Sequence, residues 1–332
     1  MPTRRAYLLS ATAFLALSLA APAVAADEQP IPVVTTFSIL GDMVQRIGGE
    51  HVTVTSLVGP NGDTHVYQPT PADARAVSEA AILVVNGLQF EGWLDRLIEA
   101  SDFHGIRVVA TEGIEPIAFD DDHDDHDDHD DHEGHDEQDH EGHDDHDEAG
   151  HDHHHHGAFD PHAWQSLQHA VVYVDNITAA LVEANPANAE AFQRNRVAYI
   201  AEIEALDSEI RGIIAQLPAE SRTVVTSHDA FQYFGQAYGL DFISPQGLGT
   251  DVEASAKDVA RLIRQIRDEG IRAVFIENIG DPRLLKRIAD ETGATIGGTL
   301  YPDALSDPDG PAATYLDMMR HNATTLAQAL AP

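Results

Sequence analysis

The hydrophobic and polar positions of this chain alternate between two periods. Short apolar, β-branched runs predict buried strands, and stretches with apolar residues three or four positions apart predict helices. The two kinds of segment alternate from residue 31 to residue 110, and again from residue 223 to residue 298. Strands that alternate with helices favour parallel β/α units. The strands that we expect span residues 31–36, 52–58, 81–85, 106–110, 223–226, 273–277 and 295–298.

Between these two parts the pattern becomes helical over a long stretch. Residues 187–217 carry one apolar stripe, whose members recur at steps of three, four and seven. About thirty helical residues span about 45 Å, which suits a strut between two lobes. The stripe contains Phe192, Tyr199, Ile203, Leu206, Ile210 and Ile213. The other helices that we expect cover residues 37–47, 71–80, 92–100, 161–183, 230–238, 254–267, 282–291 and 312–329.

The pattern therefore predicts an α/β protein with two lobes. We expect an N-terminal α/β lobe at residues 26–185, a linking helix at 186–217 and a C-terminal α/β lobe at 218–332. Each lobe should hold a central, mostly parallel sheet flanked by helices, and one long rigid helix should bridge them.

The first 25 residues have the features of a secretory signal peptide. Arg4 and Arg5 precede an apolar stretch at residues 6–21, and Ala23-Val24-Ala25 has the form of a cleavage site. We expect export to the periplasm, by the general or the twin-arginine route. The absence of cysteine excludes a lipid anchor on cysteine, and no later apolar run is long enough to span a membrane.

Residues 120–156 interrupt the first lobe with a run of unusual composition. The run contains thirteen histidines and nineteen acidic residues, with no basic or aromatic residue. Nothing apolar is present to offset the entropy of ordering, so we predict a disordered loop. Histidine-rich tracts are typical of metal binding, and we interpret this one as a set of weak metal sites. The alternative is a solvated acidic linker.

Charge and cysteine content narrow the possible partners. The formal net charge is −37, of which the acidic run contributes −19. Nucleic acids and anionic lipids both need basic surface, so neither is expected as a partner. A negative field instead concentrates cations. Without cysteine, a metal site must use histidine, aspartate and glutamate.

Three of the seven histidines outside the acidic run lie in settings typical of ligands. His65 follows a turn-rich loop after a strand, His162 follows Asp160-Pro161, and His228 lies between a strand and a helix. Open α/β sheets bind ligands beyond the carboxyl ends of their strands. Periodicity alone does not show that these residues meet. We interpret the remaining four as surface or packing residues, namely His51, His104, His169 and His321.

Five segments, three of which contain the histidines above, carry a family resemblance that covers essentially the whole mature chain. In order they read GPNGDTHVYQPTPAD, DPHAW, TSHDAFQYFG, ENIGDPRLLKRIADETGA and TLYPDALS. Each is weakly specific alone, but together they resemble the metal-binding substrate-binding proteins of bacterial zinc and manganese ABC transporters, the cluster A-I group. That family has two α/β lobes bridged by a long helix, with the metal in the cleft between them.

Carried over by position, the resemblance implies four metal ligands. They are His65 and His162 from the first lobe, and His228 and Asp303 from the second. Manganese-selective relatives usually have glutamate where this chain has His228, and three imidazoles with one carboxylate favour zinc. Zinc members of the family vary at the position of Asp303, whose alternative interpretation is a turn carboxylate. A ligating imidazole usually donates its other N–H to a carboxylate, and Asp160, Asp229 and Glu277 are plausible acceptors.

We therefore predict a periplasmic zinc-binding protein, with no catalytic activity, that delivers Zn²⁺ to an ABC permease in the inner membrane. The acidic loop collects zinc or receives it from a periplasmic chaperone, and we expect a monomer. One alternative is a manganese or iron component of the same kind of transporter, and another is a zinc buffer without a transporter. We disfavour a third alternative, a zinc hydrolase. Such an enzyme needs an open coordination position and a general base, and the chain has no HExxH motif.

Overall fold

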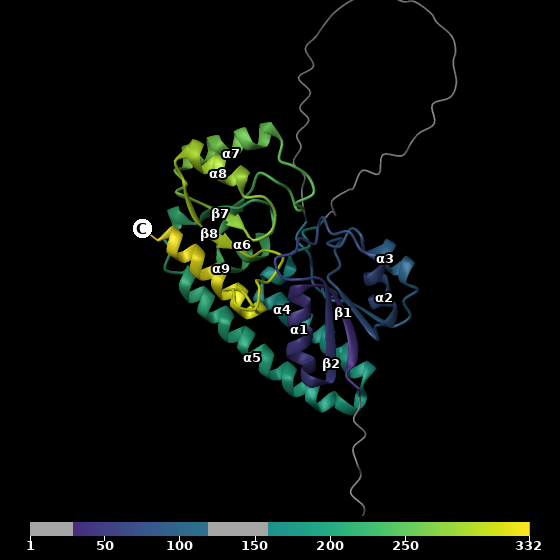
Figure 1. Ribbon diagram of the computed structural model, residues 1–332. Helices are drawn as coiled ribbons and strands as arrows, with labels where there is room; N and C mark the ends of the chain where they lie inside the picture. The colour runs from purple at the N-terminus through teal and green to yellow at the C-terminus, as the bar shows by residue number, and fades with distance from the viewer. Residues whose placement is uncertain (1–28, 119–158, 332) are drawn as a thin grey trace, which may run out of the picture.

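A computed structural model describes residues 29–118 and 159–331. The predicted signal peptide and the predicted loop at residues 120–156 lie outside these ranges. The described chain forms two lobes, each with its own parallel sheet, and one long helix runs along both (Figure 1). The predicted fold class is therefore confirmed, while the residue limits of the lobes stay a prediction from the sequence.

The first lobe is built on four parallel strands in the order β2-β1-β3-β4. The strands are short and rich in valine and isoleucine, which favour a pleated, buried surface. They are β1 (Ile31–Phe37), β2 (Val52–Val58), β3 (Ile82–Val85) and β4 (Ile106–Val109). The helices of this part are α1 (Ser38–Gly48), α2 (Pro71–Glu79), α3 (Leu94–Ser101) and α4 (Leu167–Ala184), with short 3₁₀ turns η1 (Gly49–His51), η2 (Ala163–Gln165) and η3 (Pro186–Asn188).

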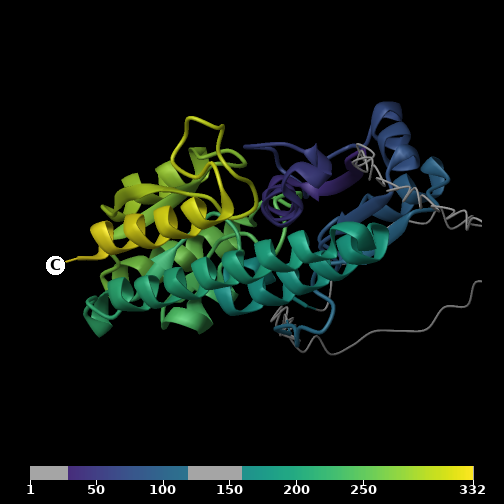
Figure 2. The same ribbon diagram turned by 90° about the horizontal axis from the view of Figure 1, so that it is seen from below.

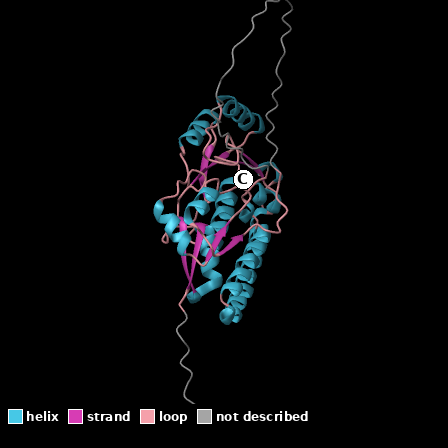
Figure 3. Cartoon of the chain, turned by 90° about the vertical axis from the view of Figure 1, so that its right-hand side faces the viewer, coloured by secondary structure: helices cyan, strands magenta, loops and turns pink. Residues whose placement is uncertain are grey.

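The second lobe repeats this arrangement in the order β6-β5-β7-β8, and its strands form a separate group in Figure 3. Its strands are β5 (Thr223–Val225), β6 (Asp241–Ile243), β7 (Ala273–Glu277) and β8 (Thr295–Leu300). Its helices are α6 (Gln232–Tyr238), α7 (Ala256–Glu269), α8 (Arg283–Thr292) and α9 (Tyr315–Leu330), and η4 (Ala219–Ser221) precedes β5. The sequence analysis did not predict β6, a strand of three residues that begins with an aspartate.

The linking helix α5 (Ala189–Ile214) runs across the front of the molecule in Figure 2, along both lobes. Its 26 residues correspond to about 39 Å, somewhat shorter than expected, because η3 takes up the start of the predicted stretch and the helix ends at Ile214 rather than Leu217. The predicted stripe is buried as far as Ile210, and Ile214 replaces Ile213 as its last fully buried member. The helix packs against α1 and α4 on one side of the molecule and against α9 on the other.

Apolar packing also connects the two lobes directly. One continuous core contains Phe37 and Trp164 beside the first sheet, and Phe231 and Tyr315 in the second part of the chain. A smaller cluster around Val274 lies between α7, α8 and their strands. Because dense cores deform little, the shared core opposes a wide separation of the lobes. Within the described residues, no helix has the length and apolar character needed to cross a membrane.

Candidate metal centre

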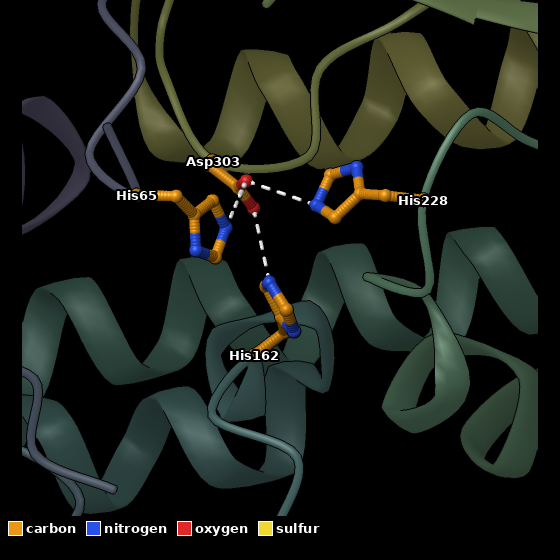
Figure 4. A group of neighbouring side chains, drawn as sticks. All are labelled: His65, His162, His228 and Asp303. Atoms are coloured by element: carbon orange, nitrogen blue, oxygen red, sulfur yellow. Dashed lines mark hydrogen bonds and ion pairs between the residues drawn. The ribbon is translucent and has the colours of Figure 1, made fainter. Parts of the chain in front are cut away.

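The structure brings together the four residues that the family resemblance implied as ligands. His65, His162, His228 and Asp303 each contribute one ligand atom, and these atoms lie within 4.8 Å of one another. The four side chains converge from separate segments of the chain (Figure 4). His65 follows β2, His228 follows β5 and Asp303 follows β8, so three of them lie beyond the carboxyl ends of parallel strands.

Asp303 occupies the middle of the group. Its Oδ2 atom lies 3.2 Å from His65 Nε2 and 3.2 Å from His228 Nε2, and its Oδ1 atom lies 3.6 Å from His162 Nε2 (Figure 4). The three imidazole rings surround it, with ring centroids 5.5 to 5.6 Å apart. All three Nε2 atoms thus face one carboxylate, which is the arrangement of a compact coordination site.

Three members of the group are fully buried. His162, His228 and Asp303 each expose 0% of their surface. Among the described residues, His162 Nε2, His228 Nε2 and Asp303 Oδ1 have no hydrogen-bond partner with acceptable geometry. Buried polar atoms are nearly always paired. A cation at the centre would satisfy these three atoms together, so the donor set fits a bound metal ion.

The outward-facing nitrogens of two imidazoles have carboxylate partners. His162 Nδ1 lies 2.7 Å from Asp160 Oδ1, and His228 Nδ1 lies 2.6 Å from Glu277 Oε2. An Nδ1–H that donates to a carboxylate leaves Nε2 as the lone-pair donor toward the centre. The predicted contacts of Asp160 and Glu277 are therefore present. Asp229 instead accepts a hydrogen bond from Gln232, and no contact with a ligand imidazole is present.

The same carboxylates also fix the backbone of the ligand residues. Asp160 Oδ1 accepts from His162 N at 2.9 Å. Glu277 Oε1 accepts from Ser227 N at 2.9 Å and from His228 N at 3.2 Å. The helix predicted from residue 161 begins only at Leu167, because His162 lies in this buried turn. Each carboxylate thus sets both the position and the ring orientation of its histidine.

The electrostatic environment of the centre favours an ionised Asp303 carboxylate and a positively charged His228. Burial alone would raise the pKa of the Asp303 carboxyl, but the rings of His162 and His228 outweigh it and hold that pKa well below its usual range. Burial alone would lower the pKa of His228, but Glu277 and Asp303 raise it well above its usual value. A positive charge at this position is therefore stabilised by carboxylates, and a metal cation would meet the same field.

A second link between the lobes was not visible in the sequence. Trp164 Nε1 and Gln165 Nε2 both donate to the carbonyl oxygen of Pro302, at 2.8 and 2.6 Å. Pro302 precedes Asp303, and Trp164 and Gln165 follow His162. These buried bonds therefore fix one ligand against another across the molecule. The only signal in the sequence was the position of two hydrogen-bonding side chains directly after DPHA.

The other described histidines lie elsewhere, as predicted. In the described part of the chain, the four residues above form the one group of histidine and acidic side chains arranged to hold a metal ion. His51 lies in η1 and His104 is exposed beside Asp102. His169 lies in α4, and His321 lies in α9 with its Nε2 3.0 Å from Thr299 O.

Comparison with known proteins places the chain in a family. The family described as "Zinc-uptake complex component A periplasmic" matches residues 33–329. The manganese-binding lipoprotein MntA of Halalkalibacterium halodurans is 32% identical, over 92% of this chain and 90% of the relative. The iron-binding protein YfeA of Yersinia pestis is 33% identical, over 98% and 96%.

A solved structure shows the same fold. The periplasmic zinc-binding protein TroA from Treponema pallidum superposes with a TM-score of 0.78 at 28% identity, over 92% of this chain and 100% of that one. The names of these three relatives refer to three different metals, namely manganese, iron and zinc. They agree on metal binding and on a binding role rather than catalysis. The chain belongs to the zinc-uptake complex component A family, and it is an extracytoplasmic, metal-binding substrate-binding protein of an ABC transporter rather than an enzyme.

Proposed function

We propose that this protein captures Zn²⁺ with His65, His162, His228 and Asp303 and delivers it to an ABC permease in the inner membrane. The observation that carries the proposal is the convergence of three imidazoles and one carboxylate within 4.8 Å. Four protein ligands without a vacant position suit tight capture. The metal is the transported substrate of the protein, so the site needs no open coordination position at which a reaction could take place.

The chemistry of the donor set supports zinc over manganese. Imidazole nitrogen suits zinc, whereas manganese prefers oxygen-rich sites with more ligands. Three of the four donors here are nitrogen atoms. Two of the imidazoles are also held by carboxylates in the orientation that points Nε2 inward. The manganese or iron alternative draws its support from the names of MntA and YfeA.

A competition experiment separates the two alternatives. The mature protein is titrated with Zn²⁺ and with Mn²⁺ against chelators of known affinity, and the tight site is counted. We expect one tight zinc site and at least about 100-fold weaker manganese binding, because imidazole-rich sites follow the order in which zinc exceeds manganese. Replacing the three ligand histidines with alanine should abolish the tight site. Equal or stronger manganese binding would overturn the zinc assignment.

We propose a separate role for residues 120–156, which lie outside the described part of the chain. Their thirteen histidines and nineteen carboxylates supply many weak ligands. The segment ends only six positions before His162 in the sequence, which supports a transfer of zinc from the segment to the buried site. Deleting residues 120–156 should leave the tight site and remove several weak ones, which calorimetry can count. Loss of the tight site on deletion would contradict the assignment to the four ligands.

The remaining parts of the proposal concern location and partners. Residues 1–25 would direct export to the periplasm, where the chain would act as a monomer and where a zinc chaperone could load the acidic segment. Release would involve local movement near the ligands, because the shared core and α5 oppose a wide opening. Co-purification with the permease separates this role from that of a zinc buffer, which would bind zinc without a membrane partner.

A further inference from the structure

One cavity beside the buried site is bordered by a single ligand residue. A cavity of about 690 Å³ opens beside the centre, and of the four ligand residues only His65 lines it. The side chain of His65 is 8% exposed, whereas those of the other three are fully buried. Both lobes contribute to the cavity wall, with Gln68 and Gln89 from the first and Leu248 and Asp251 from the second. An ion that moves between this cavity and the buried site therefore passes the imidazole of His65.

One carboxylate ties the His65 segment to the opposite wall of this cavity. Asp63 Oδ1 accepts from the backbone N–H of His65 at 3.0 Å, and Asp63 Oδ2 accepts from Thr250 Oγ1 at 2.6 Å. Thr250 belongs to residues 244–255, the connection between β6 and α7 that also carries Leu248 and Asp251. The position of His65 thus depends on a contact between the lobes at the cavity.

The other end of the same loop is fastened independently. Asn61 N donates to Leu305 O at 2.8 Å, Asn61 Nδ2 donates to Asp307 Oδ2 at 3.1 Å, and Asn61 Oδ1 accepts from Asn278 Nδ2 at 3.1 Å. Asn61 has a left-handed backbone, with φ of 54°, and these three hydrogen bonds hold it in that conformation. Loss of the Thr250 contact would therefore free the His65 end of the loop while Asn61 stays attached.

We propose that Asp63 and Thr250 are positioning residues that set the rate of metal exchange. Together they hold His65 over the path between the cavity and the buried ligands. When the bond between them breaks, His65 moves aside and the ion enters or leaves. This inference rests on the proposed zinc site. It goes further by assigning the control of exchange to two residues that do not bind the metal.

The test measures zinc release from the full mature protein. Wild-type protein and Thr250→Val are each loaded with one equivalent of Zn²⁺ and mixed with excess chelator in a stopped-flow instrument. Valine keeps the shape of threonine and removes the hydroxyl. We expect release to accelerate about 10-fold or more, the factor that loss of a hydrogen bond to a charged group produces. Capture should accelerate as well, so that the dissociation constant changes by less than the release rate.

Three further variants make the result specific. Thr250→Ser keeps the hydroxyl and should release zinc at the wild-type rate, whereas Asp63→Asn should release it faster. Ser255→Ala removes the cap of α7, where Ser255 Oγ accepts from Asp258 N at 3.1 Å, and loosens the same connection without touching Asp63. Its release rate should stay at the wild-type value. The absorption spectrum of the Co²⁺-loaded Thr250→Val protein should match wild type, because His65 still ligates at equilibrium.

The outcomes distinguish this inference from the proposed function. Wild-type protein without a tight zinc equivalent would refute the site itself. A wild-type protein that binds zinc, together with unchanged release in Thr250→Val and Asp63→Asn, would refute only the positioning role. Equal acceleration in Ser255→Ala would also refute it, since general loosening of residues 244–255 would then explain the effect.

Discussion

The buried and the peripheral ligands of the centre are held in different ways. His162 and His228 each have a carboxylate on the outward nitrogen, and Asp303 follows a carbonyl that accepts two buried hydrogen bonds. His65 borders the cavity and is positioned through its backbone by Asp63. The difference separates two tasks. We propose that the buried residues set how tightly a metal is held, and that the peripheral residue sets how quickly it is exchanged.

The largest expected change in zinc affinity comes from removing a ligand, and this change tests the difference between buried and peripheral ligands. Structural zinc sites with four ligands gain about 10–16 kcal/mol, so one ligand accounts for roughly a 100- to 1,000-fold change in affinity. His228→Ala should lie at the upper end of this range, because it also removes the imidazole that pairs with the buried Glu277 Oε2 atom. His65→Ala should lie at the lower end and should accelerate capture. Chelator competition gives the affinities, and stopped-flow mixing gives the rates.

The opposite order of the two variants would remove the distinction between buried and peripheral ligands. His104→Ala serves as the matched control, since His104 is exposed and away from the centre. Its zinc affinity and exchange rate should equal those of the wild type.

A smaller effect is expected when the carboxylate behind a ligand is changed. Glu277→Gln keeps the shape of the side chain but removes the negative charge beside His228 Nδ1. Partners of this kind contribute about 10- to 100-fold to metal affinity, because they orient the imidazole and increase its basicity. Calorimetry should show that loss in the variant.

Asp229→Asn provides the matched comparison for Glu277→Gln. Asp229 neighbours His228 in the sequence, but its carboxylate accepts from Gln232. The variant should bind zinc within about threefold of the wild type. A loss as large as that of Glu277→Gln would mean that general charge near the site, rather than contact with the imidazole, controls affinity.

The smallest expected effect concerns the scaffold behind His162. Glu91 Oε1 accepts from Thr36 Oγ1 at 2.6 Å and from Asn86 N at 2.7 Å, and Asn86 Nδ2 donates to Pro161 O at 2.9 Å. Burial raises the pKa of Glu91 above its ordinary value of 4.5, and hydrogen bonds from Thr36, Asn86 and Gly87 offset only part of that rise. Folding therefore shifts the Glu91 carboxyl toward its neutral form.

The sign of the pH dependence follows from that direction. Below pH 4.5 Glu91 is protonated in both states, and its stabilising contribution is complete. As the pH rises, the unfolded chain loses the proton first, and the folded protein loses stability until the pH passes the folded pKa. Each tenfold difference in ionisation corresponds to about 1.4 kcal/mol. Glu91→Gln lacks this titration.

Urea unfolding of the metal-free proteins measures this effect. The wild type should lose stability relative to Glu91→Gln between pH 4.5 and neutral pH. Zinc affinity should change little, because Glu91 makes no hydrogen bond to a ligand residue and is linked to His162 through Asn86 and Pro161. A constant stability difference across this range would show that Glu91 has no raised pKa in the folded protein.

Local patterns in the sequence predicted most of the elements. Apolar runs identified every strand except β6, and the stripe from Phe192 to Ile210 identified the long helix. Turn residues before His65 and His162 indicated loops suited to ligands. These features were readable because they depend on residues close together in the chain. The motif resemblance then supplied the four ligand positions, which periodicity alone had left open.

Only the tertiary structure decided which side chains meet. Asp303 lies beside His65 although 238 positions separate them in the chain. The contact of Asp63 with Thr250 and that of Trp164 with Pro302 likewise join residues from different parts of the chain. Such contacts leave no local period, because they arise when two separately folded sheets bring their loops to a common interface. The sequence by itself determined the elements and the chemical types of the donors, and packing determined which donors share one site and which of them faces the cavity.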